Sequence, residues 1–289
     1  MKKIKGIITI AVAATTLLMA GCDKTQEYDV IVPPVQAHFL NKTVGTYYVS
    51  NDPNSVFKIP VGITKASSKP TVINITMTSP TNAVSGTQYT LPTTTVTIPA
   101  GKVVDSLAVK GIFSGYATGR IDTLTFTIQS GDVPASDYNK VYKLVLRKYC
   151  AVVSNDLIGN YTTSRDYYNV TQASAATYTT SISNWTSTGA TSATVTIKNL
   201  GATLDIGFGP FLPTDGAAIG LLATLDWSNP ANFTISIASQ PYVSSLYTYG
   251  ASTVSGSGTF SSCDQTFNIG YVVRVSAGNF TGQSSILRR

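Results

Sequence analysis

The sequence predicts an all-β protein, and three observations support that fold class. Residues that favour strands, chiefly Thr, Val, Ile and Tyr, are abundant, whereas Glu27 is the single glutamate among 289 residues. Few windows therefore hold enough good helix formers to sustain a helix. Apolar residues alternate with polar ones in many short runs, as on half-buried strands. Gly, Pro, Ser and Asn separate these runs, as turns between antiparallel strands require.

Residues 1–21 are predicted to be an export signal. Lys2, Lys3 and Lys5 precede an apolar stretch that ends in small residues, which is the order found in secretory signals. This stretch of about fourteen residues is too short to span a bilayer comfortably as a helix. We therefore expect a targeting signal rather than a membrane-spanning segment.

The signal ends with Leu18-Met19-Ala20-Gly21-Cys22, which resembles the lipobox of bacterial lipoproteins. In that motif, small residues give the processing peptidase access to the bond before a cysteine that carries diacylglycerol. The resemblance implies a lipid on Cys22 that attaches the protein to a membrane. Residues 22–37 then form a lipidated tether, which Val32-Pro33-Pro34 makes stiff and extended near its end. An ordinary cleaved signal with an incidental cysteine is the alternative.

Residues 38–149 are predicted to form an antiparallel β-sandwich, because alternating runs recur there between turn residues. The apolar positions of these runs are Phe57/Ile59/Val61/Ile63, Ile73/Ile75/Met77, Val96/Ile98, Leu107/Val109, Leu124/Phe126/Ile128 and Tyr142/Leu144/Leu146. This part of the chain is also basic, with eleven Lys and Arg against five Asp between residues 39 and 149. We expect a solvated basic face; steering of an acidic partner is the alternative.

Three segments of this part, in order, resemble the Calx-beta family. They are Gly86-Thr87-Gln88-Tyr89-Thr90, Pro99-Ala100-Gly101 and Asp122-Thr123-Leu124. The resemblance implies an immunoglobulin-like sandwich. Calcium-binding members crowd acidic side chains at one end, whereas here Gln88 replaces an expected Asp and Asp122 stands alone. Because Ca²⁺ takes about six to eight oxygen ligands, we expect no calcium site, and no other metal.

Residues 150–289 are predicted to form a second all-β domain, either a second sandwich or a small β-barrel that closes to remove its edges. Leu157-Ile158-Gly159-Asn160-Tyr161 resembles the opening of bacterial lipocalin-like domains. The alternating runs are Tyr178/Thr180/Ile182, Ala193/Val195/Ile197, Phe233/Ile235/Ile237 and Phe267/Ile269/Tyr271/Val273/Val275. Cys150 and Cys263 remain as a pair after lipidation of Cys22, so a disulfide is expected in an oxidising compartment. Two free buried thiols are the alternative.

Catalytic equipment is poor. His38 is the single histidine; it lies at the end of the tether with no partner signature for a catalytic relay around it, and zinc needs two or more nitrogen or thiolate ligands, which this chain cannot assemble. No phosphate loop or dinucleotide fingerprint is present, so we expect no cofactor. We therefore predict a non-enzymatic protein without catalytic residues. A glycoside hydrolase using two of Asp205, Asp215 and Asp226 is the remaining enzymatic alternative.

Aromatic residues offer the better functional indication. Exposed rings stack on the C–H faces of sugars, while neighbouring Asp or Asn side chains bond the hydroxyls. The possible ligand-binding residues are Trp185, Asp226, Trp227, Tyr242, Tyr247 and Tyr249. Packing of the same rings into a β core is the alternative interpretation.

Taken together, the lipobox, the Calx-beta-like part and the second β part resemble accessory surface lipoproteins of Bacteroidota. This resemblance implies an outer-membrane location, exposed at the cell surface, near a starch-utilisation-type transporter. We expect a binding or accessory role, with a glycan ligand and a transporter or surface protein as partner. A structural or assembly role in a surface complex is the alternative. Nucleic acid is not expected, because loss of Lys2, Lys3 and Lys5 leaves no basic cluster interleaved with aromatics.

Overall fold

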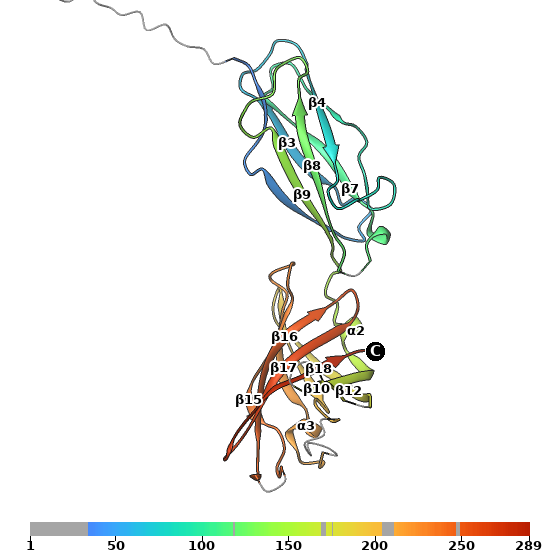
Figure 1. Cartoon of the computed structure of the whole chain (residues 1–289), viewed down its shortest axis with the longest axis vertical. Helices are drawn as coiled ribbons and strands as arrows, with labels where there is room; N and C mark the ends of the chain where they lie inside the picture. The colour runs from blue at the N-terminus through green and yellow to red at the C-terminus, as the bar shows by residue number, and fades with distance from the viewer. Residues whose placement is uncertain (1–33, 118, 169–171, 175, 204–210, 247–248) are drawn as a thin grey trace, which may run out of the picture.

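The chain folds into two strand assemblies in series, joined by one connection (Figure 1). This computed structural model describes residues 34–117, 119–168, 172–174, 176–203, 211–246 and 249–289. Helical turns are short: η1 (Phe113–Gly115), α2 (Ser154–Leu157) and α3 (Gly216–Ile219). The predicted all-β fold class is confirmed. Within the described ranges, no helix has the length and apolar character to cross a membrane. The predicted signal and Cys22 lie outside these ranges.

The first assembly is a sandwich of two sheets. Its strands are β1 (Ala37–Phe39), β2 (Val44–Val49), β3 (Phe57–Ile63), β4 (Thr71–Thr78), β5 (Tyr89–Thr90), β6 (Thr95–Ile98), β7 (Val104–Gly111), β8 (Ile121–Gln129) and β9 (Val141–Lys148). One sheet has the order β1-β3-β7-β5 and the other the order β2-β9-β8-β4-β6. Strands β2 and β9 run parallel. The predicted alternation places Leu124, Phe126 and Ile128 of β8 in the core between the sheets.

The second assembly is a closed barrel. Its strands are β10 (Gly159–Tyr168), β11 (Gln172–Ala173), β12 (Tyr178–Gly189), β13 (Ser192–Lys198), β14 (Leu221–Asp226), β15 (Thr234–Pro241), β16 (Thr253–Ser261), β17 (Thr266–Val275) and β18 (Gly278–Leu287). Each strand from β12 to β18 pairs with the next, and β10 pairs with both β12 and β18. Of the two architectures that the sequence left open, the barrel forms, because this last pairing closes the ring and removes its edges.

The barrel interior is filled by side chains. Tyr161, Phe267 and Ile269 are completely buried. The described parts of the loops before β14 and after β15 lie at the end of the barrel away from the sandwich (Figure 1), and Leu200, Ala217, Tyr242 and Leu246 of these loops are buried. Burial of apolar surface stabilises a fold by roughly 25 cal/mol per Å². The filled interior therefore stabilises the barrel.

The connection between the assemblies carries the predicted disulfide, because Cys150 and Cys263 are bonded. The hydroxyl of Ser262 donates to the Cys150 carbonyl at 2.7 Å. The Tyr149 ring lies between two others, with ring centroids 6.1 Å from Tyr48 of the sandwich and 6.2 Å from Phe233 of the barrel. The linker is thus fixed to the turn between β16 and β17.

Candidate functional site

The fold brings Trp185 and Trp227 together, although they are far apart in the sequence. Their ring centroids lie 5.7 Å apart and their planes meet at 37°. Trp185 follows Asn184, whose φ of 55° belongs to an irregularity in the pairing of β12 with β13. Trp227 follows β14, and its N–H donates to the carbonyl of Thr191 at 3.0 Å. Strands β12, β13 and β14 are neighbours, so both rings reach one end of the barrel wall.

Both rings are half-buried against the barrel core and leave one part open to solvent. The indole of Trp185 donates to Ser187 Oγ at 3.3 Å. Asp226 is exposed beside Trp227, and its Oδ1 accepts the backbone N–H of Ser228 at 2.8 Å. That bond holds the pKa of the Asp226 carboxyl below its usual range, so the group is charged at neutral pH. The arrangement can stack a flat apolar face and accept hydrogen bonds beside it.

Tyr242 does not belong to this site, and the prediction that it binds a ligand is wrong. The ring is fully buried, packs edge-on against Phe211, and its hydroxyl donates to the Leu200 carbonyl at 2.6 Å. It fills the core under the loops, so no ligand can stack on it. It also lies at the β14 end that begins with Leu221, opposite to the end that Trp227 follows.

Tyr249, another of the predicted tyrosines, is not beside the tryptophans either. Tyr249 is 42% exposed and makes an edge contact with Phe280, in the loop that follows Tyr242. Tyr247 lies outside the described residues. The aromatic residues predicted as one platform are therefore divided between two ends of the barrel, and the tryptophan end unites Trp185, Trp227 and Asp226.

The carboxylates of the enzymatic alternative are also separated. Asp215 is 2% exposed, and its oxygens accept Leu212 N–H at 2.8 Å and the N–H and hydroxyl of Ser244 at 2.8 and 2.6 Å. Burial raises the pKa of this carboxyl, but the bonds from Ser244 and Leu212 outweigh burial and leave the pKa lowered. Asp215 precedes β14 and Asp226 ends it, and a six-residue strand spans about 17 Å.

Paired glycosidase carboxylates lie roughly 5 to 10 Å apart. Asp215 and Asp226 do not form such a pair, because β14 separates them and the oxygens of Asp215 are engaged by backbone and serine donors. Asp205 lies outside the described residues. Among the residues the structure describes, no group of three or more His, Cys, Asp or Glu side chains could hold a metal ion.

Asp122 of the sandwich, which the sequence left standing alone, has a partner. Its carboxylate is 1% exposed and is held by Arg120, with Nε at 2.8 Å from Oδ2 and Nη2 at 3.2 Å from Oδ1. The positive charge of the Arg120 guanidinium therefore compensates the buried negative charge of Asp122.

A buried carboxylate in the barrel was not predicted from the sequence. Asp166 of β10 is completely buried. Its Oδ1 accepts the hydroxyls of Tyr178 at 2.7 Å and Ser285 at 2.6 Å, and its Oδ2 accepts the N–H and hydroxyl of Thr203 at 2.9 and 2.8 Å. Burial raises the pKa of Asp166, while these bonds oppose the rise. The carboxylate ties β10, β12, β18 and Thr203 together.

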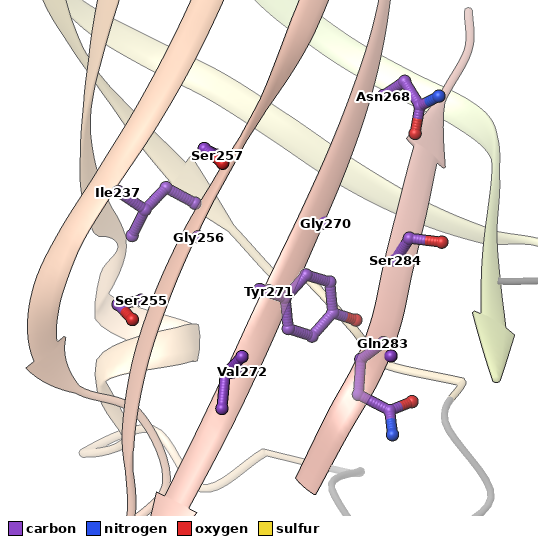
Figure 2. A pocket seen from close by; sticks show the side chains of 11 residues that line it. Ile237, Ser255, Gly256, Ser257, Asn268, Gly270, Tyr271, Val272, Gln283 and Ser284 are labelled. Carbon is purple, nitrogen blue, oxygen red and sulfur yellow. The ribbon is translucent and has the colours of Figure 1, made fainter. Parts of the chain in front are cut away.

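A hollow of about 620 Å³ lies on the barrel wall formed by β15 to β18. Figure 2 shows Ser255, Ser257, Asn268 and Ser284 around Gly270. Tyr271 is the one ionisable side chain in the described lining, and its buried hydroxyl bonds Ser285 Oγ at 3.1 Å. Burial raises the pKa of this phenol, so the hollow contains no group suited to acid or base catalysis near neutral pH.

No protein-family model and no curated protein sequence matches the chain. Solved structures resemble it at low identity. The apo Calx CBD1 domain is 12% identical, covers 40% of this chain and 98% of its own, and gives a TM-score of 0.33. A candidate carbohydrate-binding protein from Bacteroides ovatus is 14% identical, covers 86% of this chain and 70% of its own, and gives a TM-score of 0.35.

A multidomain Bacteroides ovatus protein that includes DUF1735 is 13% identical, covers 88% of this chain and 94% of its own, and gives a TM-score of 0.32. The neighbours thus include both Calx-beta domains and proteins of Bacteroides. At identities below 25% and TM-scores below 0.5, these similarities support no inference about ligand or activity.

Proposed function

We propose that this chain is a non-enzymatic, lipid-anchored protein of the outer membrane whose barrel binds a glycan through Trp185 and Trp227. The observation that carries the proposal is the pairing of these rings, 5.7 Å apart and half-buried, beside the charged and exposed Asp226. A sugar presents a flat C–H face to such rings and a hydroxyl to the carboxylate. Few polar groups beside an apolar surface are typical of specific small-ligand sites.

The absence of turnover in this proposal rests on how the carboxylates are used. In the part of the chain that the structure describes, Asp122 is held by Arg120, Asp166 by hydroxyl donors, and Asp215 by Leu212 and Ser244. None of these carboxylates faces another across a gap that would hold a sugar. The bound glycan is therefore passed on rather than cleaved, in this proposal to a transporter beside the anchor.

The lipid anchor is tested by metabolic labelling with a fatty-acid probe. The exported chain is expected to incorporate the probe, and the Cys22→Ser chain is expected to lose it. Labelling that is absent from the unaltered chain, or retained after Cys22→Ser, would contradict lipidation at this residue.

Glycan binding is tested with the full exported chain on a glycan array. Replacing a central aromatic anchor costs roughly 2 kcal/mol or more, so Trp227→Ala and Trp185→Ala should each weaken binding on the order of tenfold or more. Tyr138→Ala is the matched control, because this tyrosine is 83% exposed on the sandwich. Equal binding by all three variants would refute the site. Absence of any glycan ligand, with capture of a membrane protein, would favour the structural or assembly role.

A further inference from the structure

The described chain begins at one end of the sandwich, where the tether is pinned to a loop. The N–H of Gln36 donates to Thr64 Oγ1 at 3.0 Å, the N–H of Thr64 donates to the Gln36 carbonyl at 3.0 Å, and Thr64 Oγ1 donates to the Pro34 carbonyl at 3.2 Å. Thr64 opens the loop of residues 64–70 between β3 and β4. The tether therefore leaves the sandwich beside this loop.

This end of the sandwich is opposite to the barrel. The loop of residues 130–140 also lies here, because the N–H of Asp132 bonds the Val72 carbonyl at 3.0 Å, at the start of β4. Strand β9 begins after that loop and runs to Lys148, from which the connection leads to the barrel. Figure 1 shows the blue start of the described chain at the end of the sandwich far from the barrel.

Exposed lysines gather at this end. Lys65 and Lys69 lie in the loop, and the turn that carries Lys102 is held against it by the bond from Gly101 N–H to the Ser67 carbonyl at 2.8 Å. Lys65 and Lys69 line a hollow of about 550 Å³. Among the described residues, neither they nor Lys102 form a salt bridge. Asp132, the one acid in the described lining, accepts Val72 N–H at 2.7 Å.

We propose that this tether face, defined by Lys65, Lys69 and Lys102, lies against the membrane and binds the phosphate groups of anionic lipids. The inference rests on the proposed lipidation of Cys22, which holds the face near the bilayer. A tether of residues 22–36 reaches at most about 50 Å when extended. Basic residues beside a lipid anchor add electrostatic attraction to an anionic surface.

Electrostatic attraction to an anionic membrane must come from the tether face, because the tether itself does not supply it. The tether carries Asp23, Glu27 and Asp29 against Lys24 and is therefore acidic. Because these lysines lie at one end of the sandwich, their contact with the bilayer also orients the sandwich so that its opposite end points away from the membrane. The barrel is then carried to the end of the molecule that is farther from the lipid, with the tryptophan pair at the barrel end nearer the sandwich, where Phe233 contacts Tyr149 of the connection.

The test uses residues 22–289 with Cys22→Ser, so that neither the basic, apolar export signal nor lipidation contributes, in sedimentation with vesicles. One set contains phosphatidylcholine, and the other phosphatidylcholine mixed with phosphatidylglycerol. Binding should require the anionic vesicles and weaken as salt is added. Replacing Lys65, Lys69 and Lys102 by Gln should weaken binding by roughly fivefold for each lysine.

The matched control replaces Lys58, Lys110 and Lys198 by Gln, which removes the same charge from exposed positions away from the tether face. Equal weakening by both triple variants, or equal binding to neutral and anionic vesicles, would overturn the proposal. Binding to a soluble acidic protein instead of vesicles would do the same. None of these outcomes bears on glycan binding, which is measured without vesicles, or on lipidation, which is measured by the fatty-acid label.

Discussion

Asp166 shows how one residue can organise a barrel from within. Its carboxylate, on β10, accepts four hydrogen bonds from β12, β18 and Thr203, and the residue is completely buried. Buried hydroxyl and N–H donors need an acceptor, and leaving one without a partner costs free energy. The Asp166 carboxylate supplies that acceptor. Asp166 therefore acts as a structural clamp at the end of the barrel that the loops cover.

Asp166→Ala is predicted to destabilise the barrel by about 1 to 3 kcal/mol, because Tyr178, Ser285 and Thr203 lose a buried acceptor. Urea unfolding followed by tryptophan emission measures the change. Tyr138→Ala serves as the control at an exposed position and should leave the midpoint unchanged. An unaltered midpoint for Asp166→Ala would show that the clamp contributes nothing.

The pH dependence follows from the raised pKa of Asp166 in the fold. The folded chain binds the proton more tightly than the unfolded chain, so this group adds stability as the pH falls through its folded pKa. The gain in stability is complete below the pKa of the unfolded chain, which is about 3.9. Asp166→Asn does not titrate, so the stability difference should shift in favour of the unaltered chain on acidification. A constant difference in urea unfolding between neutral and acidic pH would contradict this.

Sequence patterns reveal a residue of this kind poorly. Asp166 stands among the polar residues Ser164, Arg165 and Tyr167, and nothing local distinguishes an inward carboxylate from an outward one. Tyr242 was misjudged for the converse reason, because a Tyr- and Ser-rich segment is typical of an exposed loop. Burial of both is decided by distant partners, Ser285 and Leu200, which periodicity cannot identify.

At the scale of elements, strands with apolar inward positions could be predicted and strands with small or polar ones could not. Alternating large apolar residues predict β8, β9 and β17 as half-buried strands. In contrast, β16 turns Gly256 and Gly258 inward, and β18 turns Gln283 and Ser285 inward. Closure of the barrel depends on the pairing of β18 with β10. Because β18 lacks an alternating apolar pattern, the sequence alone could not decide between a barrel and a sandwich.

The disulfide is the element-scale link between the connection and the barrel. Replacing Cys150 and Cys263 together by Ser should destabilise the barrel by about 2 to 5 kcal/mol, because the bond closes a long loop in the unfolded chain. The sequence separation of the two cysteines is 113. Urea unfolding of the oxidised chain and of the double variant measures this. Equal midpoints would mean that Ser262 and Tyr149 alone hold the connection.

For the whole molecule, two separate hydrophobic cores predict two separable unfolding events. Leu144 is completely buried in the sandwich, so Leu144→Ala should cost about 2 to 5 kcal/mol there. Both tryptophans of the chain are in the barrel, so tryptophan emission reports on the barrel alone. The variant should lower the sandwich transition seen by circular dichroism and leave the emission midpoint unchanged. Equal shifts of both signals would mean that the two cores unfold as one.

The same two tryptophans give the most direct test of glycan capture, since Trp185 and Trp227 supply all of the tryptophan emission. Emission of the full exported chain is titrated with a glycan identified on the array, beside calorimetry of the same mixture. Stacking on the paired rings predicts a saturable change in emission whose midpoint equals the calorimetric one. A glycan that binds by calorimetry and leaves the emission unchanged would place its site elsewhere and contradict the proposed role of the pair.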